Sequence, residues 1–408
     1  MPEASPALEP AAELAYLRSP RAIRDRSAAL YALCQRGELA HFALDEDRLE
    51  YAVDRVIEVT QGVYPDWRQI PLHGRFRHFS AGGVDRLARL DAAIAGLSSE
   101  EQLMTRFELV ITSVLLDAGA GERWAYREAD GAVFGRSEGL AVASFDWFVA
   151  GGFSSDSSAP YRADAAKLQA LTASDLASAF QITPENPLIG VDGRVRLLRE
   201  LGRVVEARRD HFGNSGRLGA LALHLLEGAT GDRIEAASIL SAILLGLGEI
   251  WPGRETLYGQ NLGDVFTHRA VGKVPFHKLS QWLTYSLCEP LEAKGLHIAG
   301  LSELTGLAEY RNGGLFLDAG VLVPKHAGVL GEAHSVDSEV VVEWRALTLA
   351  LLDRTAERLR KRVGLSAEEL PLARVLEGGT WRAGRVLANE KRPGGGPPLR
   401  IVSDGTVF

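Results

Sequence analysis

The 408-residue sequence predicts a mainly α-helical protein with a compact multi-helix globular fold. Apolar residues recur at helical spacing in many segments; within 47–59, Leu49 and Val53 begin one such face. Two further segments, 236–248 and 339–352, are apolar on almost every side, as helices in the middle of a protein are. Strand patterns are sparse.

The expected elements follow in order. A proline at 275 fits the first turn of a helix, and Ser366 with Glu369 forms a capping box before the last one. At the C-terminus, two short β-type runs flank a Pro/Gly loop, which predicts a small β-hairpin. The expected helices are 10–35, 47–59, 84–96, 98–119, 137–150, 163–179, 193–210, 234–249, 275–294, 337–361 and 366–376, and the hairpin strands are 385–389 and 399–403.

No internal repeat and no long polar linker divides the chain. We therefore expect residues 1–408 to form a single, mostly helical unit, in which two lobes can be accommodated. Residues 1–14 are expected to form a flexible N-terminus, and 379–408 a hairpin-like C-terminal tail.

Composition narrows the classes of partner. Hydrophobic residues make up 46% and charged residues 24%, a balance typical of globular proteins. The net charge of −8, without a basic run, argues against a nucleic-acid partner. The longest apolar run is too short to span a bilayer, so no membrane partner is expected. Two distant cysteines, Cys34 and Cys288, fit a cytoplasmic protein. The oligomeric state is not indicated.

Two charges lie inside the apolar segment 339–352. Glu343 shares a helical line with apolar residues, and so does Arg345. Because an unpaired buried charge is costly, each needs a partner or a function. The sequence leaves both open: a structural bridge to neighbouring helices or a role in a site.

Two positions in the first half of the chain indicate an anion site or a buried ion pair. Asp117 ends an apolar helix, where the helix dipole disfavours a carboxylate, so it either meets a cation or caps its own loop. Ser137 follows Arg136 at a predicted helix N-terminus, an arrangement that favours phosphate or carboxylate.

Polar and aromatic residues gather in 251–294. Arg254 and Asp264 lie close to aromatic residues, and the carboxylate of Asp264 either caps a surface turn or sits in an apolar pocket. The helix after Pro275 carries side chains suited to a flat heterocycle or a sugar, namely Gln281, Trp282 and Tyr285.

The stretch 304–322 interrupts an apolar segment with Glu309, Arg311 and Asn312, followed by two glycines. No histidine or cysteine spacing predicts a metal site, and no nucleotide-cofactor fingerprint is present, so no metal or cofactor is expected. Carboxylates, arginines and amides in apolar helical surroundings suit a neutral or anionic small molecule and acid–base chemistry.

Several stretches closely resemble a family first described in fungal uracil catabolism, long a domain of unknown function. The resemblance covers residue 15 to the C-terminus and implies a role in pyrimidine-ring degradation through a ribosylated urea. The matching stretches are "DAGAGERWAY", "GRSEGLAVASFDWF", "YGQNLGDVFTH", "VPFHKLSQWLTYSLCEPLE", "LTGLAEYRNGGLFLDAGVL", "VVVEWRALTLALLD", "LARVLEGGTWRAGR" and "SDGTVF".

"LTGLAEYR" and "EWRA", with a looser match around Asp264, also resemble the queuosine-salvage N-glycosidases, whose DNA-glycosylase-like fold this likeness implies. The likeness implies Asp264 as the ribose-side carboxylate, with Glu343 or Glu309 as the acid–base partner. Arg136, Arg254 or Arg345 would hold a 5′-phosphate. Asn312 and the glycines replace the Pro-Gln of those proteins, so queuosine itself is not expected as substrate.

The resulting hypothesis is an N-glycosidase that hydrolyses a ribosylurea, or its 5′-phosphate, to urea and ribose or ribose 5-phosphate. Glu309, Arg311 and Asn312 would edge its pocket, with the adjacent glycines allowing close approach of the backbone to the substrate. Two alternatives remain: an amidohydrolase or deaminase of the same pathway, and a non-catalytic binding partner of a pathway enzyme.

Overall fold

The structure is a computed structural model of the chain and describes residues 9–121, 123–251 and 255–402. Helices dominate it, as the sequence predicts. They are α1 (Pro10–Leu17), α2 (Pro20–Gln35), α3 (Arg48–Val63), α4 (Phe76–Phe79), α5 (Arg86–Ile94), α6 (Ser99–Leu115), α7 (Arg136–Val149), α8 (Ala165–Ala170), α9 (Ala173–Ala179), α10 (Val191–Ala207), α11 (Arg209–Phe212), α12 (Ala220–Glu227), α13 (Ala236–Leu247), α14 (Lys278–Ala293), α15 (Tyr310–Asp318), α16 (Gly328–Gly331), α17 (Glu339–Val363), α18 (Leu372–Val375) and α19 (Trp381–Lys391).

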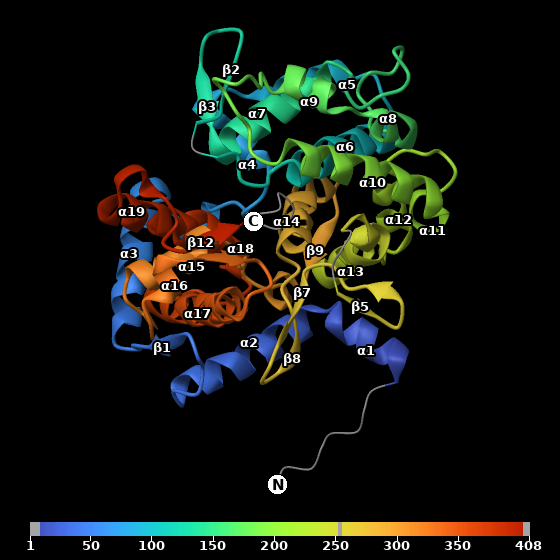
Figure 1. Cartoon of the computed structure of the whole chain (residues 1–408). Coiled ribbons are helices and arrows are strands. Elements are labelled where there is room, and N and C mark those ends of the chain that lie inside the picture. The colour runs from blue at the N-terminus through green and yellow to red at the C-terminus, as the bar shows by residue number, and fades with distance from the viewer. Residues whose placement is uncertain (1–8, 122, 252–254, 403–408) are drawn as a thin grey trace.

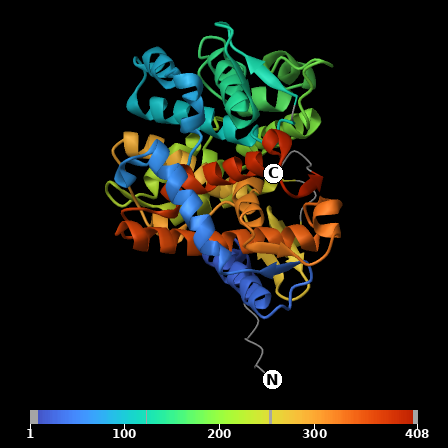
Figure 2. The ribbon, with the colours of Figure 1, turned by 90° about the vertical axis from the view of Figure 1, so that its left-hand side faces the viewer.

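The helices are arranged in two parts that lie one above the other. Helices α4–α9, drawn in colours from blue to green, form the upper part, and α2, α3 and α15–α19 belong to the lower part (Figure 1). Figure 2 shows the same division from the side. Helix α14 joins the two parts because it packs against α6 and α13. Among the described residues, no helix is long and apolar enough to cross a membrane.

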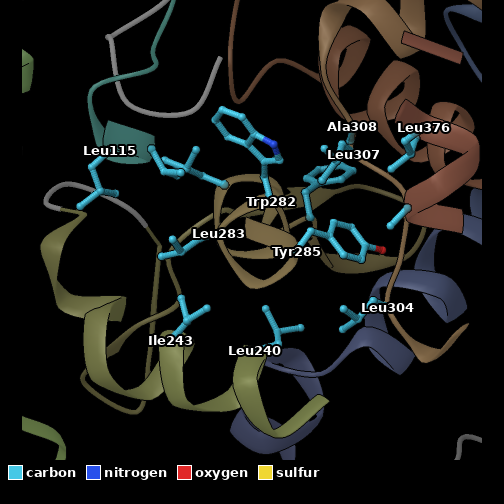
Figure 3. Packing of buried hydrophobic residues seen from close by; sticks show 14 of the residues in the cluster. Leu115, Leu240, Ile243, Trp282, Leu283, Tyr285, Leu304, Leu307, Ala308 and Leu376 are labelled. Carbon is cyan, nitrogen blue, oxygen red and sulfur yellow. The ribbon is translucent and has the colours of Figure 1, made fainter. Parts of the chain in front are cut away.

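The core is continuous around α14. Side chains from both faces of this helix are buried, including Trp282, Leu283 and Tyr285. Figure 3 shows them above Leu240 and Ile243 of α13. The helix is thus enclosed by other parts of the protein along most of its length.

The strands are short and occur in pairs. Antiparallel pairs join β1 to β10, β2 to β3, β5 to β6 and β7 to β8, and parallel pairs join β4 to β9 and β11 to β12. They tie loops together and form no continuous sheet. The bounds are β1 (Phe42–Leu44), β2 (Ala125–Arg127), β3 (Val133–Gly135), β4 (Arg233–Glu235), β5 (Thr256–Leu257), β6 (Gln260–Asn261), β7 (Val265–His268), β8 (Gly272–Pro275), β9 (His297–Ala299), β10 (Leu322–Pro324), β11 (Ala333–Ser335) and β12 (Arg400–Val402).

The predicted C-terminal hairpin is wrong. Residues 385–389 lie inside α19, and β12, within the predicted strand 399–403, pairs with β11 instead. The run around 385 contains Leu, Ala and Glu, which favour a helix over a strand. Its helical face, with Gly384 and Leu387, is buried against α15. The tail 379–408 is thus a helix and a strand, with 403–408 outside the described residues.

Several predicted boundaries also change. The helix expected over 10–35 is two helices, because Ser19 caps the second and Pro20 begins it. Residues 10–14, expected to be flexible, belong to α1, and Leu14 is buried; residues 1–8 lie outside the described part of the chain. The helix expected over 163–179 divides at Thr172, which forms a capping box.

Burial of the apolar helices is partly as predicted. Every residue from 340 to 352 of α17 is buried. In α13, however, Leu245 is exposed together with two serines one and two turns before it, so this helix has a solvent edge. Ser366 and Glu369 exchange the two capping-box hydrogen bonds, but the segment forms only a turn before α18.

Candidate functional site

One large cavity lies where the two parts of the molecule meet. Its volume is ≈ 550 Å³, which falls within the range of small-molecule sites. We call it the central cavity. Its described lining residues come from five regions of the chain: His73 and His78; Asp117, Gly119, Ala120 and Gly121; Arg136, Ser137, Glu138, Leu140 and Ile189; Lys278, Trp282, Leu307, Glu309, Tyr310 and Arg311; and Trp381, Arg385, Gly396, Pro397, Leu399, Arg400 and Ile401.

Asp117 lies in the wall contributed by the upper part. It meets a cation, one of the two possibilities that the sequence left open. Arg75 Nη1 is 3.1 Å from Asp117 Oδ1, and Ser137 Oγ donates to Asp117 Oδ2 at 3.2 Å. Arg75 is fully buried and also donates to Ser113 Oγ. The carboxylate is therefore held from behind while it faces the cavity.

Glu309 lies in the opposite wall and has a structural reason for its position. It is the N-cap of α15, and its two carboxylate oxygens accept the backbone N–H groups of Arg311 and Asn312 at 2.7 and 2.6 Å. This contact places an ionisable group at the cavity rim in one orientation. Burial raises the pKa of Glu309, although these N–H groups and Lys278 act in the other direction.

Arginines from three elements form a positive region in the cavity. Arg136 Nη2 donates to Gly394 O, Arg311 Nη1 donates to Gly395 O at 2.7 Å, and Arg385 Nη1 donates to Glu138 Oε1 at 3.1 Å. Burial lowers the pKa of Arg311, and the charges of Arg136 and Arg385 lower it further. Arg136 adopts a left-handed backbone with φ 54°, a conformation that costs energy outside glycine and recurs at functional sites.

An aromatic wall stands beside these charges. The ring of Trp282 lies 5.9 Å from that of His78 and 6.5 Å from that of His73, centroid to centroid. His73 Nδ1 is 2.8 Å from Glu377 Oε2, which fixes the orientation of its ring. Burial, together with the Arg75 charge, lowers the pKa of His78 to about 3, so this imidazole is neutral. The wall can support a planar group.

Asp264, predicted as the ribose-side carboxylate, does not line the central cavity. It forms a bidentate pair with Arg345, whose Nη1 and Nη2 donate to Asp264 Oδ1 and Oδ2 at 2.7 and 2.8 Å. Burial opposes ionisation, but the Arg345 charge and hydrogen bonds lower the pKa of Asp264 below its usual value. The carboxylate is thus favoured in its ionised form, and both of its oxygens accept hydrogen bonds from Arg345.

This pair positions two residues of the cavity. Asp264 Oδ2 also accepts the backbone N–H of Lys278 at 2.9 Å, and Arg345 Nε donates to Ala308 O at 3.2 Å. Lys278 begins α14, and Ala308 directly precedes Glu309. The pair therefore holds the starts of α14 and α15 in register, so that Lys278 and Glu309 face the same space.

Glu343, the other predicted acid–base residue, also lies outside the central cavity. Its oxygens accept the N–H groups of Ala40 and His41 at 3.1 Å each. It forms a cluster with His268 and Glu339, in which one ligand atom from each lies within 4.8 Å of the others.

The histidine of this cluster is not set up to bind a metal. His268 Nδ1 accepts the N–H of Ala270 at 3.1 Å. The proton of the neutral ring then belongs to Nε2, which lies 3.2 Å from Glu339 Oε1 and 3.6 Å from Glu343 Oε1. A nitrogen that carries a proton does not ligate a cation, so this tautomer fits electrostatic contact with the two carboxylates better than metal binding.

Other predicted binding residues have roles in packing. Gln281 Oε1 accepts from Thr305 N, Tyr285 Oη donates to Thr305 O, and Asn312 bonds to Leu307 O and to the Thr380 hydroxyl. All three lie outside the cavity. Gly313 packs against Trp344, where an added Cβ would come within 2.5 Å of the indole; this close contact with protein replaces the expected approach to substrate. Arg254 lies outside the described residues.

Of the predicted site residues, the cavity brings together Asp117, Arg136, Ser137, Trp282, Glu309 and Arg311. Four residues of the cavity were not predicted from the sequence: Lys278, the two histidines of the aromatic wall, and Arg385. Lys278 has one unusual feature, because it is a cation at the N-terminus of a helix, where the helix dipole favours an anion. Asp117 is the converse case, an anion at a helix C-terminus. Arg385 carried none, since its segment was predicted as a strand.

Fold and site together define a mainly helical protein whose described residues enclose a large cavity, lined by charged, aromatic and apolar side chains, at the junction of its two parts. The chain belongs to the family described as "Protein of unknown function (DUF1688)", which matches residues 16–408. This finding confirms the family resemblance predicted from the sequence.

Two named relatives match almost end to end. The chain is 40% identical to Protein urg3 of Schizosaccharomyces pombe over 408 positions, which cover 97% of this chain and 99% of the relative. It is 35% identical to Uracil catabolism protein 4 of Lachancea kluyveri over 436 positions, with 97% and 99% covered.

Proposed function

We propose that this protein acts in uracil catabolism as an N-glycosidase, hydrolysing the bond between ribose and the urea nitrogen of a ribosylurea or its 5′-phosphate. The relative named Uracil catabolism protein 4 supports the pathway, because the two chains align over nearly their full lengths. The observation that carries the proposed reaction is the meeting of Asp117 and Glu309 in one cavity.

The chemistry requires negative charge near the sugar. As the C1′–N bond breaks, positive charge develops on the ribose ring, and a fixed carboxylate stabilises it. Asp117 suits this role better than Asp264, since Asp117 faces the cavity while Arg345 occupies both oxygens of Asp264. The Arg75 and Ser137 contacts keep Asp117 in place.

Glu309 is assigned as the base that takes a proton from the attacking water. Its raised pKa brings it closer to neutral pH, where a general base is most effective. The backbone N–H groups of α15 hold its carboxylate without consuming all of its lone pairs.

The arginines supply a place for a 5′-phosphate. Arg136, Arg311 and Arg385 line the cavity together, and Glu138 is a carboxylate of the lining that bonds to Arg385. Guanidinium groups bind phosphate through paired hydrogen bonds. This part of the cavity favours the phosphorylated substrate.

A product assay tests the proposal. Purified protein is incubated with ribosylurea and, separately, with its 5′-phosphate, and urea and free sugar are measured. We expect urea and sugar in equal amounts, with faster release from the phosphate. Ammonia without free sugar would indicate an amidohydrolase or deaminase instead, and tight binding without any product would indicate a non-catalytic partner.

A further inference from the structure

Lys278 is a buried cation whose ammonium group has no hydrogen-bond or ion-pair partner among the described residues. Its side chain lines the central cavity, and the residue is only 9% exposed. Two other buried cations have clear partners: Arg345 bonds to Asp264, and Arg194 bonds to backbone carbonyls of the 116–119 loop. Lys278 differs from these two arginines because its side chain lines the cavity, where a bound molecule can reach it.

The surroundings act on the pKa of this amine in opposite directions. Burial lowers the pKa of Lys278, while the charges of Glu309 and Asp117 raise it. The centroid of the Trp282 indole lies 5.8 Å from Nζ. Because Lys278, Asp117 and Glu309 line the same cavity, an ammonium that pairs with neither carboxylate can donate to a molecule bound there.

The backbone around Lys278 holds it in place against local preference. His277, the residue before it, adopts a left-handed conformation with φ 46°, and its Nε2 is 2.9 Å from Leu17 O. Asp264 accepts the Lys278 N–H. A cation at a helix N-terminus is also unfavourable. The position of Lys278 therefore does not favour stability, and the contacts of His277 and Asp264 maintain it.

We propose that Lys278 is the general acid of the reaction and protonates the nitrogen that leaves C1′. This inference rests on the proposed function. Expelled without a proton, the ureido nitrogen would carry a negative charge and leave slowly, so an acid beside it is required. Lys278 lines the same cavity as Asp117 and lies against Trp282 of the aromatic wall, which matches that requirement.

The step balances without any further reactant. The C1′–N bond breaks as Lys278 Nζ gives its proton to the nitrogen. The oxygen of one water molecule bonds to C1′, and a proton of that water passes to Glu309. Return of this proton from Glu309 to the Lys278 amine restores both groups, and the products are ribose, or its 5-phosphate, and urea.

The test compares two leaving groups in Lys278→Met and Lys278→Arg. A ribosyl pyridinium carries a leaving group that departs as a neutral molecule and needs no proton. We expect both variants to lose about 10²–10⁴-fold in kcat on ribosylurea, with KM changed only a few-fold, and to keep their rate on the pyridinium within about tenfold. Arginine keeps the charge but cannot give up its proton near neutral pH.

The pH profile gives a second readout. In the wild type the rate on ribosylurea must fall as pH rises through the pKa of Lys278, because only the protonated amine is an acid. This alkaline decline should be missing with the pyridinium. Thermal melting of both variants confirms that they are folded.

Three results would overturn the role of Lys278. Equal losses on both substrates would make the residue structural, full activity of Lys278→Arg on ribosylurea would make its charge sufficient, and a borohydride-stable adduct at Lys278 would make it a nucleophile. If the wild type hydrolyses neither compound, the proposed function fails as well. If the wild type hydrolyses both compounds but Lys278→Met does not show the expected loss on ribosylurea, the proposed function stands and Lys278 is not its general acid.

Discussion

Two pairs of charged residues are associated with the first turn of α14, namely Asp264 with Arg345 and Lys278 with Glu309. They differ in how completely their hydrogen-bonding atoms are satisfied. Asp264 and Arg345 use their hydrogen-bonding atoms on each other and on the backbone of Lys278 and Ala308. Lys278 and Glu309 instead face a cavity of ≈ 550 Å³, where the amine has no partner among the described residues. Equal burial thus accompanies two roles: the first pair supports the architecture, and the second is available to a ligand.

The largest expected effect comes from a residue that faces the cavity. Glu309→Gln should lower kcat by about 10²–10⁴-fold, the usual contribution of a general base, while the amide still caps α15. In the wild type, activity should decline as pH falls through the pKa of Glu309, since only the ionised form accepts a proton. That decline should lie above the pH typical of a free carboxylate. Steady-state kinetics against pH measure both quantities.

The exposed Glu303→Gln, six residues earlier, is the matched control and should retain wild-type kinetics. If Glu309→Gln also kept full activity, the base would have to be another group.

Substitutions in the Asp264–Arg345 pair should mainly change the stability of the protein. Asp264→Asn leaves the Arg345 charge buried without its counter-charge and should reduce the free energy of unfolding by about 3–5 kcal/mol. Urea denaturation measures this loss. Because Asp264 also positions Lys278, kcat should fall too, but by less than in Glu309→Gln.

Replacing both partners sharpens this comparison. In Asp264→Leu with Arg345→Met, no charge is left uncompensated, so most of the lost stability should return. If the double variant were as unstable as Asp264→Asn, the pair would matter through its shape or its backbone contacts more than through its charges.

The positive region of the cavity should affect only the phosphorylated substrate. Arg385→Ala should raise KM for ribosylurea 5-phosphate by about 10–150-fold, as for the loss of a charge-assisted hydrogen bond worth about 1.5–3 kcal/mol, and leave KM for ribosylurea nearly unchanged. Arg382→Ala is the control, because Arg382 lies on the same helix but bonds to Glu377 outside the cavity. Equal effects of Arg385→Ala on the two substrates would place the phosphate elsewhere.

The smallest effect concerns packing near the site. Gly313→Ala brings a methyl group within 2.5 Å of Trp344 and should destabilise the protein by about 1–3 kcal/mol, as overpacking does. Gly331→Ala in α16 is a matched control, since nothing lies within 4 Å of its added methyl group, and it should be neutral or slightly stabilising. Thermal unfolding distinguishes the two, and a neutral Gly313→Ala would show that Trp344 can move aside.

Helical content and the burial of α17 could be predicted because periodicity over many residues reports which faces are apolar. The segment 385–389 could not be assigned correctly, since five residues are too few to separate a helical from an alternating pattern. Its burial depends on contact with α15, which is 70 residues away in the chain.

The site was predicted in part for a similar reason. A charge inside an apolar segment, such as Glu309 or Asp264, shows that something must compensate it, and both residues are indeed buried. Whether the partner is another side chain or a ligand depends on the tertiary structure: Asp264 meets Arg345, 81 residues away, while Glu309 faces the cavity. The local sequence does not show whether the compensating partner is another side chain or a ligand.

The most direct test is single-turnover release of urea from ribosylurea 5-phosphate by the wild type, Glu309→Gln and the Asp264→Leu/Arg345→Met double variant, each shown to be folded. We predict measurable release by the wild type, a rate at least about 100-fold lower for Glu309→Gln, and a rate within about tenfold of the wild type for the double variant. The opposite order of the two variants, or no release by the wild type, would contradict the assignment of the chemistry to the central cavity.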